Sequence, residues 1–467
     1  MVAFRCPRVN GRAGEPLAGG KKSMHTYNPN ADNPSPASRR ECLAWAFYDF
    51  ANSGYTTVVL TTIYSAYFVG VIAAGTDEQS PGQATLLWTL GIGAANAIVL
   101  IAGPIIGAIA DYRASKKAFL FLSTVVCVLG TAGLAAVGPG DPVTALLLLV
   151  LATVAFAAGE NLIAAFLPEI ATRENMGRIS GYGWSLGYFG GLLTLGSCLA
   201  YVNWSDTRGL PATHYVPVSL VITAVIFALT AAPTFIWLRE RALPKATPQG
   251  ASLVTLGLRQ VWTTLSHAAQ LRDLFRCLVC ITLFQAGVAT VVVVAAIYAQ
   301  DVMNFSSQQL IVLIMVVNLT AAVGAFFFGF IQDRIGSVAA LMAALIVWIA
   351  AIGVAFSAQS ETAIWVSGNL IGLAMGSTQA GSRALIGRLT PAARNAEIFG
   401  LWGLANRAAA ILGPISYGLV SDVGGGDHQL ALLSTLAWFV AGFVLLFSVS
   451  EARGMADARR ESALAAP

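Results

Sequence analysis

The sequence predicts an all-α membrane protein with twelve transmembrane helices in two parallel repeats of six. Three observations lead to this fold class: an apolar composition, basic residues in alternate loops, and two halves that match each other. The chain has 467 residues, of which 56% are hydrophobic and 11% are charged, and its mean hydropathy is +0.70. A soluble domain carries about 25% charged residues, so this composition excludes an ordinary soluble fold.

Apolar blocks of bilayer length define the expected helices. A helix needs about 20 predominantly apolar residues to cross the hydrocarbon core, and blocks of that size alternate here with charged or Pro- and Gly-rich breaks. The expected spans are 44–70, 84–110, 118–138, 143–166, 180–202, 216–238, 273–300, 308–331, 338–357, 362–385, 397–421 and 430–450.

The spans divide the chain into five segments. We expect a disordered cytoplasmic tail at 1–40, a six-helix bundle at 41–238, a cytoplasmic linker at 239–272, a second six-helix bundle at 273–450 and a cytoplasmic tail at 451–467. The first tail is polar, and no apolar segment follows its basic residues, so it does not resemble a signal peptide.

The linker is expected to contain a short amphipathic helix on the membrane surface, because its apolar residues recur at helical spacing. These residues are Val254, Leu258, Val261, Trp262 and Leu265.

The loops support the count of twelve. Basic residues occupy both tails and every second loop, whereas the remaining six loops together contain one, Arg208. Cytoplasmic loops are enriched in Lys and Arg, so both termini are expected on the cytoplasmic side. The expected membrane is a bacterial inner membrane, with a vacuolar membrane as the alternative.

The two halves repeat each other. The segment "TTVVLTTIY" (56–64) matches "TVVVVAAIY" (290–298), and Asn96, Gly107 and Asp111 match Asn318, Gly329 and Asp333 at one constant offset. Six helices per half with the same orientation form a parallel repeat. In transporters built in this way, the substrate site lies between the halves.

A loop motif occurs once in each half, and we expect it to gate the protein rather than to bind substrate. The first copy contains Gly107 and Asp111, and the second contains Gly329, Asp333 and Arg334. Glycine permits close backbone approach, and the acid can meet a helix end or a base at the cytoplasmic surface. The first copy has Ala114 where such motifs commonly have Gly.

Polar residues inside the spans are the candidates for the substrate and proton-coupling site. Each charge at the bilayer centre costs at least ~2.5–3.5 kcal/mol, so each needs a reason. In the first span, polar residues at i, i+3, i+4, i+7 and i+8 share one helix face; these are Asp49, Asn52, Ser53, Thr56 and Thr57. The full candidate set is Asp49, Asn52, Ser53, Thr56, Glu160, Asn161, Gln285, Gln379, Arg383 and Arg407.

Each of these charges also has a structural interpretation. Glu160 could pair with Arg383 as a bridge between the halves. Arg383 lies near enough to the inner surface to extend its guanidinium into water. Arg407 lies deeper, which favours a ligand or a buried partner. Asp49 could have the purely structural role of hydrogen bonding to the backbone of a cytoplasmic loop.

Three segments resemble one branch of the major facilitator superfamily. They are "YDFANSGYTTVVL" (48–60), "FLPEIATRENMGRISGYGWSLGYFGG" (166–191) and "QAGSRALIGRLTPAARNAEIFGLWGLANRAAAILGP" (379–414). The branch is the vacuole effluxers, which include fungal autophagy-related amino-acid effluxers and bacterial relatives. The resemblance implies the major facilitator fold. One departure concerns the substrate: the family usually has an Asn near Ala164, whereas this chain has Glu160 and Asn161.

The sequence therefore predicts a secondary active transporter that works by alternating access and exports amino acids or similar small zwitterionic metabolites. Proton coupling is one option that it leaves open. Export of drug-like amphiphiles and a non-transporting membrane scaffold or sensor are the alternatives. We expect a small-molecule substrate, contact with the lipid bilayer, a monomer, no nucleic acid, no cofactor and no metal. Since no nucleophile–base or metal constellation appears, an enzyme is not expected.

Overall fold

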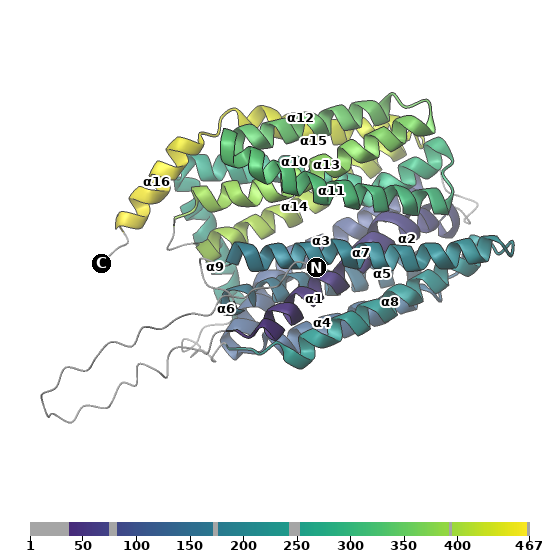
Figure 1. Cartoon of the computed structure of the whole chain (residues 1–467), viewed down its shortest axis with the longest axis horizontal. Helices are drawn as coiled ribbons and strands as arrows, with labels where there is room; N and C mark the ends of the chain where they lie inside the picture. Colours follow the sequence, from purple (N-terminus) through teal and green to yellow (C-terminus); the bar gives the residue numbers. More distant parts are fainter. Residues whose placement is uncertain (1–36, 74–81, 171–175, 242–252, 392–394, 465–467) are drawn as a thin grey trace, which may run out of the picture.

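The structure is a computed structural model that describes residues 37–73, 82–170, 176–241, 253–391 and 395–464. Within these residues every regular element is helical. The helices form two layers, one from each half of the chain, with α3 and α14 side by side where the layers meet (Figure 1). The predicted fold class is thereby confirmed as an all-α bundle.

The N-half supplies six spans. The first is continuous through four elements, α1 (Arg39–Tyr55), η1 (Thr56–Thr62), α2 (Ile63–Tyr67) and η2 (Phe68–Ile72). The others are α3 (Gln83–Arg113), α4 (Lys116–Leu134), α5 (Pro142–Ala164), α7 (Met176–Asp206) and α8 (Ala212–Trp237). A one-turn helix, α6 (Leu167–Ile170), follows α5.

The C-half supplies the other six. They are α10 (Arg272–Met303), α11 (Ser307–Ile335), α12 (Ser337–Phe356), α13 (Glu361–Leu389), α14 (Asn395–Val423) and α15 (His428–Leu446). Two further helices lie outside the spans: α9 (Leu253–Gln270) in the linker and α16 (Glu451–Leu464) after the last span.

Eleven helices in the described part of the chain are long and apolar enough to cross a bilayer. The twelfth expected span, 362–385, coincides with α13, which packs against α11 and α12. This helix carries Ser377, Gln379, Ser382 and Arg383 toward its end, and these polar residues lower its hydropathy.

We call the end of the bundle where α1 begins the basic end, because helices begin or end there at basic residues, which are Arg39, Arg113, Arg272, Arg334 and Arg388.

The first span differs from the regular α-helix assumed for its polar stripe. From Thr56 it continues as a π-helix, η1, in which each turn holds more residues. The Thr57 hydroxyl donates to the carbonyls of Ser53 at 2.8 Å and Gly54 at 3.3 Å, and such bonds compete with the backbone ladder. The wider turn rotates the residues after Tyr55 away from the face that carries Asp49.

Helix α1 packs against a glycine-rich face of α7. A Cβ atom added at Gly187 would lie 2.9 Å from Ser53 Oγ, and one added at Gly190 would overlap the carbonyl oxygen of Phe50. Small residues of this kind allow two helix backbones to approach closely in a membrane. Two residues of the polar stripe, Asp49 and Ser53, point this way and therefore lie against α7.

This packing predicts a position-specific loss of stability. Gly190→Ala should lower the melting temperature of the purified protein by several degrees, because the new methyl group can be accommodated only if the backbones of α1 and α7 separate. Gly196→Ala is the matched control on the same helix, since a Cβ atom there meets nothing within 4 Å. Equal melting temperatures for the two variants would contradict this account of the α1–α7 contact.

The two halves also touch near the end opposite the basic end. The Trp88 indole N–H of α3 donates to the Val293 carbonyl of α10 at 3.2 Å. The hydroxyls of Tyr215 on α8 and Ser307 on α11 lie 2.8 Å apart. These contacts link the two halves at that end.

Candidate functional site

An ion pair joins the two halves inside the membrane region. Arg407 Nη2 on α14 donates to Glu160 Oε2 on α5 at 2.8 Å. The side chain of Arg407 is 19% exposed and that of Glu160 is 41% exposed, so solvent reaches the acid more than the base. The hypothesis that Glu160 pairs with Arg383 is therefore wrong: the long Arg407 side chain reaches Glu160 from deeper along α14, and Arg383 lies against other side chains.

Arg383 lies between two tryptophans instead of extending to the surface. Its guanidinium carbon is 5.3 Å from the ring centroid of Trp184 on α7 and 5.3 Å from that of Trp402 on α14. A guanidinium over an indole face is attracted by the ring quadrupole. Because α7 belongs to the N-half and α14 to the C-half, this arrangement is a second link between the halves.

Asp49 lies close to this link. A Cβ atom at Gly183 would overlap its carboxylate, which places the acid against α7, at the residue that precedes Trp184. Asp49 is near enough to both Glu160 and Arg383 for their charges to interact. The side-chain hydroxyl of Ser53 donates to the Asp49 carbonyl at 3.0 Å, so this stripe residue bonds to its own helix.

The four charges are divided between the halves by sign. Asp49 and Glu160, the acids, come from the N-half, whereas Arg383 and Arg407, the bases, come from the C-half. All four lie on helix segments nearer the basic end or at mid-depth. The arrangement offers an acidic wall and a basic wall that face each other across the interface.

The remaining candidates fall into two groups. Gln285 on α10 lies in the bundle, where its amide nitrogen donates to Asn406 Oδ1 at 3.1 Å, and Asn52 is buried with no partner for Oδ1 among the described residues. Thr56 and Gln379 are half-buried. Asn161 is exposed and lies apart from the ion pair, although it follows Glu160 in the chain.

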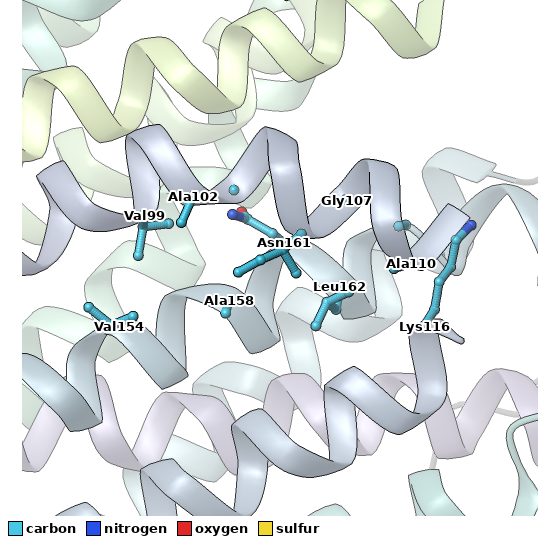
Figure 2. A pocket seen from close by; sticks show the side chains of 12 residues that line it. Val99, Ala102, Gly107, Ala110, Lys116, Val154, Ala158, Asn161 and Leu162 are labelled. Atoms are coloured by element: carbon cyan, nitrogen blue, oxygen red, sulfur yellow. The ribbon is translucent and has the colours of Figure 1, made fainter. Parts of the chain in front are cut away.

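Asn161 lines a small cleft of about 80 Å³ between α3 and α5. Figure 2 shows its amide pointing toward α3, among apolar side chains that include Val99 and Leu162. Gly107 of the first loop motif lies along the same cleft. A drug-sized ligand usually occupies a pocket of about 300–1,000 Å³, so this cleft is too small to hold one as it stands.

The sequence did not single out Asn406, although it directly precedes Arg407 and is one of few amides within an apolar span. The positions of Trp184 and Trp402 beside Arg383 could not be deduced from spacing either. In the second loop motif, Arg334 is exposed near the end of α11, and Gly336 ends that helix with a φ of 89°. The equivalent Ala114 has a φ of 48°. The side chains of Asp111 and Asp333 and the surroundings of Gly329 lie outside the described residues.

At the basic end, two acids bind the N-termini of helices at corresponding places in the two halves. Glu240, which follows α8, accepts from the backbone N–H groups of Lys116 and Lys117 at the start of α4, at 2.7 and 3.2 Å. Glu451, which begins α16, accepts from those of Ser337 and Val338 at the start of α12, at 2.8 and 3.3 Å. A carboxylate at a helix N-terminus accepts hydrogen bonds from N–H groups that have no partner within the helix, and its negative charge interacts favourably with the positive end of the helix dipole.

Glu451 should make stability depend on pH. Partial burial would raise its pKa, but hydrogen bonds from Arg388 and from the two backbone N–H groups outweigh this and hold the pKa below its ordinary value of 4.5. A lowered pKa in the folded state stabilises the fold above pH 4.5, and this contribution is lost as the pH falls through the folded-state value.

We therefore expect Glu451→Gln to lower the melting temperature at about pH 6, and the difference from wild type to shrink toward about pH 3. Thermal melting of purified protein at several pH values measures this. Glu361→Gln, at an exposed position, is the control and should change little. A difference that stays constant down to pH 3 would rule out the carboxylate as its cause.

The family follows from comparison of the whole chain. The model of the family described as "Vacuole effluxer Atg22 like" matches residues 37–459. The chain belongs to this family. The vacuole effluxer match covers all helices of both halves, and it confirms the resemblance carried by residues 48–60, 166–191 and 379–414.

The relatives of this vacuole effluxer family member include a protein named as an MFS-type transporter. An uncharacterized MFS-type transporter of Bacillus subtilis, YxiO, is 25% identical over 410 residues, covering 87% of this chain and 94% of that protein. Autophagy-related protein 22 of Yarrowia lipolytica is 26% identical over 334 residues, covering 64% of this chain and 55% of that protein. The chain thus spans about half the length of this fungal relative.

Solved structures show the same fold. The nucleoside transporter NupG aligns with a TM-score of 0.66 at 14% identity, covering 87% of this chain and 99% of that one. A D-xylose–proton symporter aligns with a TM-score of 0.66 at 15% identity, covering 89% and 98%. The vacuole effluxer chain therefore has the major facilitator fold. The family match and the MFS-type relative identify it as a multi-pass MFS-type transporter rather than an enzyme.

Proposed function

We propose that the protein is a secondary active transporter that works by alternating access and exports amino acids or similar small zwitterionic metabolites. The observation that supports this most is the division of charge, with Asp49 and Glu160 on one half and Arg383 and Arg407 on the other. A zwitterion carries one charge of each sign. Its ammonium can face the acids while its carboxylate faces a guanidinium, whose paired N–H groups suit a carboxylate.

The contacts between the halves suit alternating access. At the basic end the halves are linked by the Glu160–Arg407 pair and by Arg383 on Trp184. At the other end they are linked by Trp88 with Val293 and by the Tyr215–Ser307 hydroxyls. A substrate that competes for Arg407 would release the first set, which lets the halves rock about the bound molecule.

The basic end is proposed to be cytoplasmic, because Lys and Arg gather at the loops of that end. The proposed membrane is the inner membrane of a bacterium, in keeping with a Bacillus subtilis relative that matches over nearly its whole length; a vacuolar membrane is the alternative.

One chain supplies both halves, so we propose a monomer. Asp49 is the proposed site of proton coupling, and Asp111 and Asp333 are proposed to act in the conformational cycle.

The test is a ligand screen followed by transport. Purified protein is melted in the presence of single amino acids, dipeptides or hydrophobic cations, since a ligand that binds the folded state raises its apparent stability. Ligands found in this way are then followed into proteoliposomes under a pH gradient. We expect amino acids to raise the melting temperature and to be transported.

Two other results would overturn the proposal. Stabilisation by hydrophobic cations alone, with transport of those cations, would indicate export of drug-like amphiphiles. If no compound is bound or transported by folded protein, a scaffold or sensor role would replace transport of zwitterions.

A further inference from the structure

Three polar side chains of the C-half, which we call the polar cluster, lie on α10 and α14 in the middle of the bundle. Gln285 on α10 is 8% exposed, and its amide nitrogen donates to Asn406 Oδ1 on α14 at 3.1 Å. Trp402 lies one turn before Asn406 on the same helix. Gln285 is roughly 20 Å from the start of α10, at about 1.5 Å per residue, which is near the bilayer centre.

Two buried atoms of this cluster have no hydrogen-bond partner among the described residues. They are Gln285 Oε1, which accepts, and Trp402 Nε1, which donates. Leaving such an atom unpaired costs about 1–3 kcal/mol, and polar groups at this depth are rarely kept without a function. The cluster therefore presents one unfilled acceptor and one unfilled donor.

The cluster adjoins both bases of the C-half. Asn406 directly precedes Arg407, and the Trp402 ring lies 5.3 Å from the guanidinium carbon of Arg383. If the proposed function is right, a substrate carboxylate held by these bases would bring the rest of the molecule next to Gln285 and Trp402.

We propose that Gln285, Asn406 and Trp402 form a side-chain subsite for a neutral group that both donates and accepts hydrogen bonds, so that amide-bearing amino acids such as glutamine are the substrates that fit best. This rests on the proposed function. A carboxamide can donate N–H to Gln285 Oε1 and accept from Trp402 Nε1. An aliphatic side chain leaves both atoms unpaired, and a carboxylate side chain sets oxygen against Gln285 Oε1.

The experiment compares three ligands of similar size: glutamine, glutamate and norleucine. Their affinities for the purified full chain in lipid nanodiscs are measured by calorimetry. Because a site built to hydrogen-bond a group rejects analogues that lack it, we expect glutamine to bind at least about tenfold more tightly than either of the others.

Two variants remove one unfilled atom each and keep most of the volume. Trp402→Phe retains a ring beside Arg383 but lacks the N–H, and Gln285→Met lacks the amide. Each should weaken glutamine binding about tenfold while leaving norleucine binding unchanged. Trp438→Phe is the control, because the Trp438 N–H already donates to Ser416 Oγ at 2.9 Å, ten residues further along α14 than Asn406; its glutamine affinity should equal that of wild type. Melting curves verify that every variant is folded.

The outcomes separate the subsite from the proposed function. Equal wild-type affinities for glutamine and norleucine would overturn the subsite and leave zwitterion transport standing. An equal loss of both ligands in Trp402→Phe and Gln285→Met would also overturn it, since a purely structural role predicts that result. If wild-type protein binds and transports no amino acid, both proposals fail.

Discussion

Arg407→Lys should weaken substrate binding about tenfold even though the positive charge is kept. One guanidinium nitrogen, Nη2, donates to Glu160 Oε2 at 2.8 Å, and a substrate carboxylate that displaces Glu160 can accept two parallel hydrogen bonds from the guanidinium. Lysine offers a compact charge without this planar fork. Equilibrium binding of an amino acid identified in the ligand screen measures the effect.

The control for this substitution is Arg208→Lys. Arg208 is exposed and lies 3.8 Å from the Trp204 ring centroid, remote from the interface, so the affinity should be unchanged. Should Arg407→Lys bind the amino acid as tightly as wild type, the fork has no role in recognition.

A charge exchange distinguishes a ligand role of the pair from a latch role. The double variant Glu160→Arg, Arg407→Glu keeps an ion pair between α5 and α14 but reverses the acidic and basic walls. A latch needs only the pair, so its function would be restored relative to either single variant. A ligand site needs each sign on its own side, and we therefore expect the double variant to fold, as judged by melting, yet to bind no amino acid.

Asp49→Asn should abolish transport driven by a pH gradient while leaving exchange of substrate at equal pH on both sides. Asp49 is near enough to Glu160 and Arg383 for their charges to interact, and it sits against Gly183 at the interface of the halves. Movement of the halves would change these neighbours, and nearby charges alter the affinity of a carboxylate for protons. Asparagine keeps the shape but cannot take up or release a proton.

Proteoliposomes loaded with substrate measure both activities on the same preparation. Asp141→Asn is the matched control: Asp141 caps α5 by accepting from the Thr144 N–H at 3.2 Å, and Asn caps helices about as well as Asp. Full gradient-driven transport by Asp49→Asn would remove this acid from the coupling mechanism. Loss of exchange and of binding as well would assign it to the substrate ammonium instead.

Properties that depend on local composition could be predicted from the amino-acid sequence. Eleven of the twelve expected spans coincide with helices that are apolar enough to cross a membrane. This agreement is expected because the free energy of transferring a segment into lipid is close to the sum of the contributions of its own residues. The unusual cost of a charge in lipid likewise singled out Asp49, Glu160, Arg383 and Arg407.

Properties that depend on the rotation and contact of helices could not be predicted in this way. Glu160 pairs with Arg407 and not with Arg383, Arg383 lies between Trp184 and Trp402, and Asn406 joins Gln285. All of these contacts except Arg383 with Trp402, which lie on consecutive helices, join helices far apart in the chain. Which side chains meet depends on how the ridges of side chains on one helix fit into the grooves of the other. The hydropathy of a segment does not contain this information.

The first span shows the same division within one helix. Its length and polarity follow from its own residues, but η1 shifts the face presented after Tyr55. The small residues of α7 then bring Asp49 and Ser53 against a neighbouring backbone. Which side of a helix faces a partner is settled by packing between helices, since the bilayer itself favours no rotation about the helix axis.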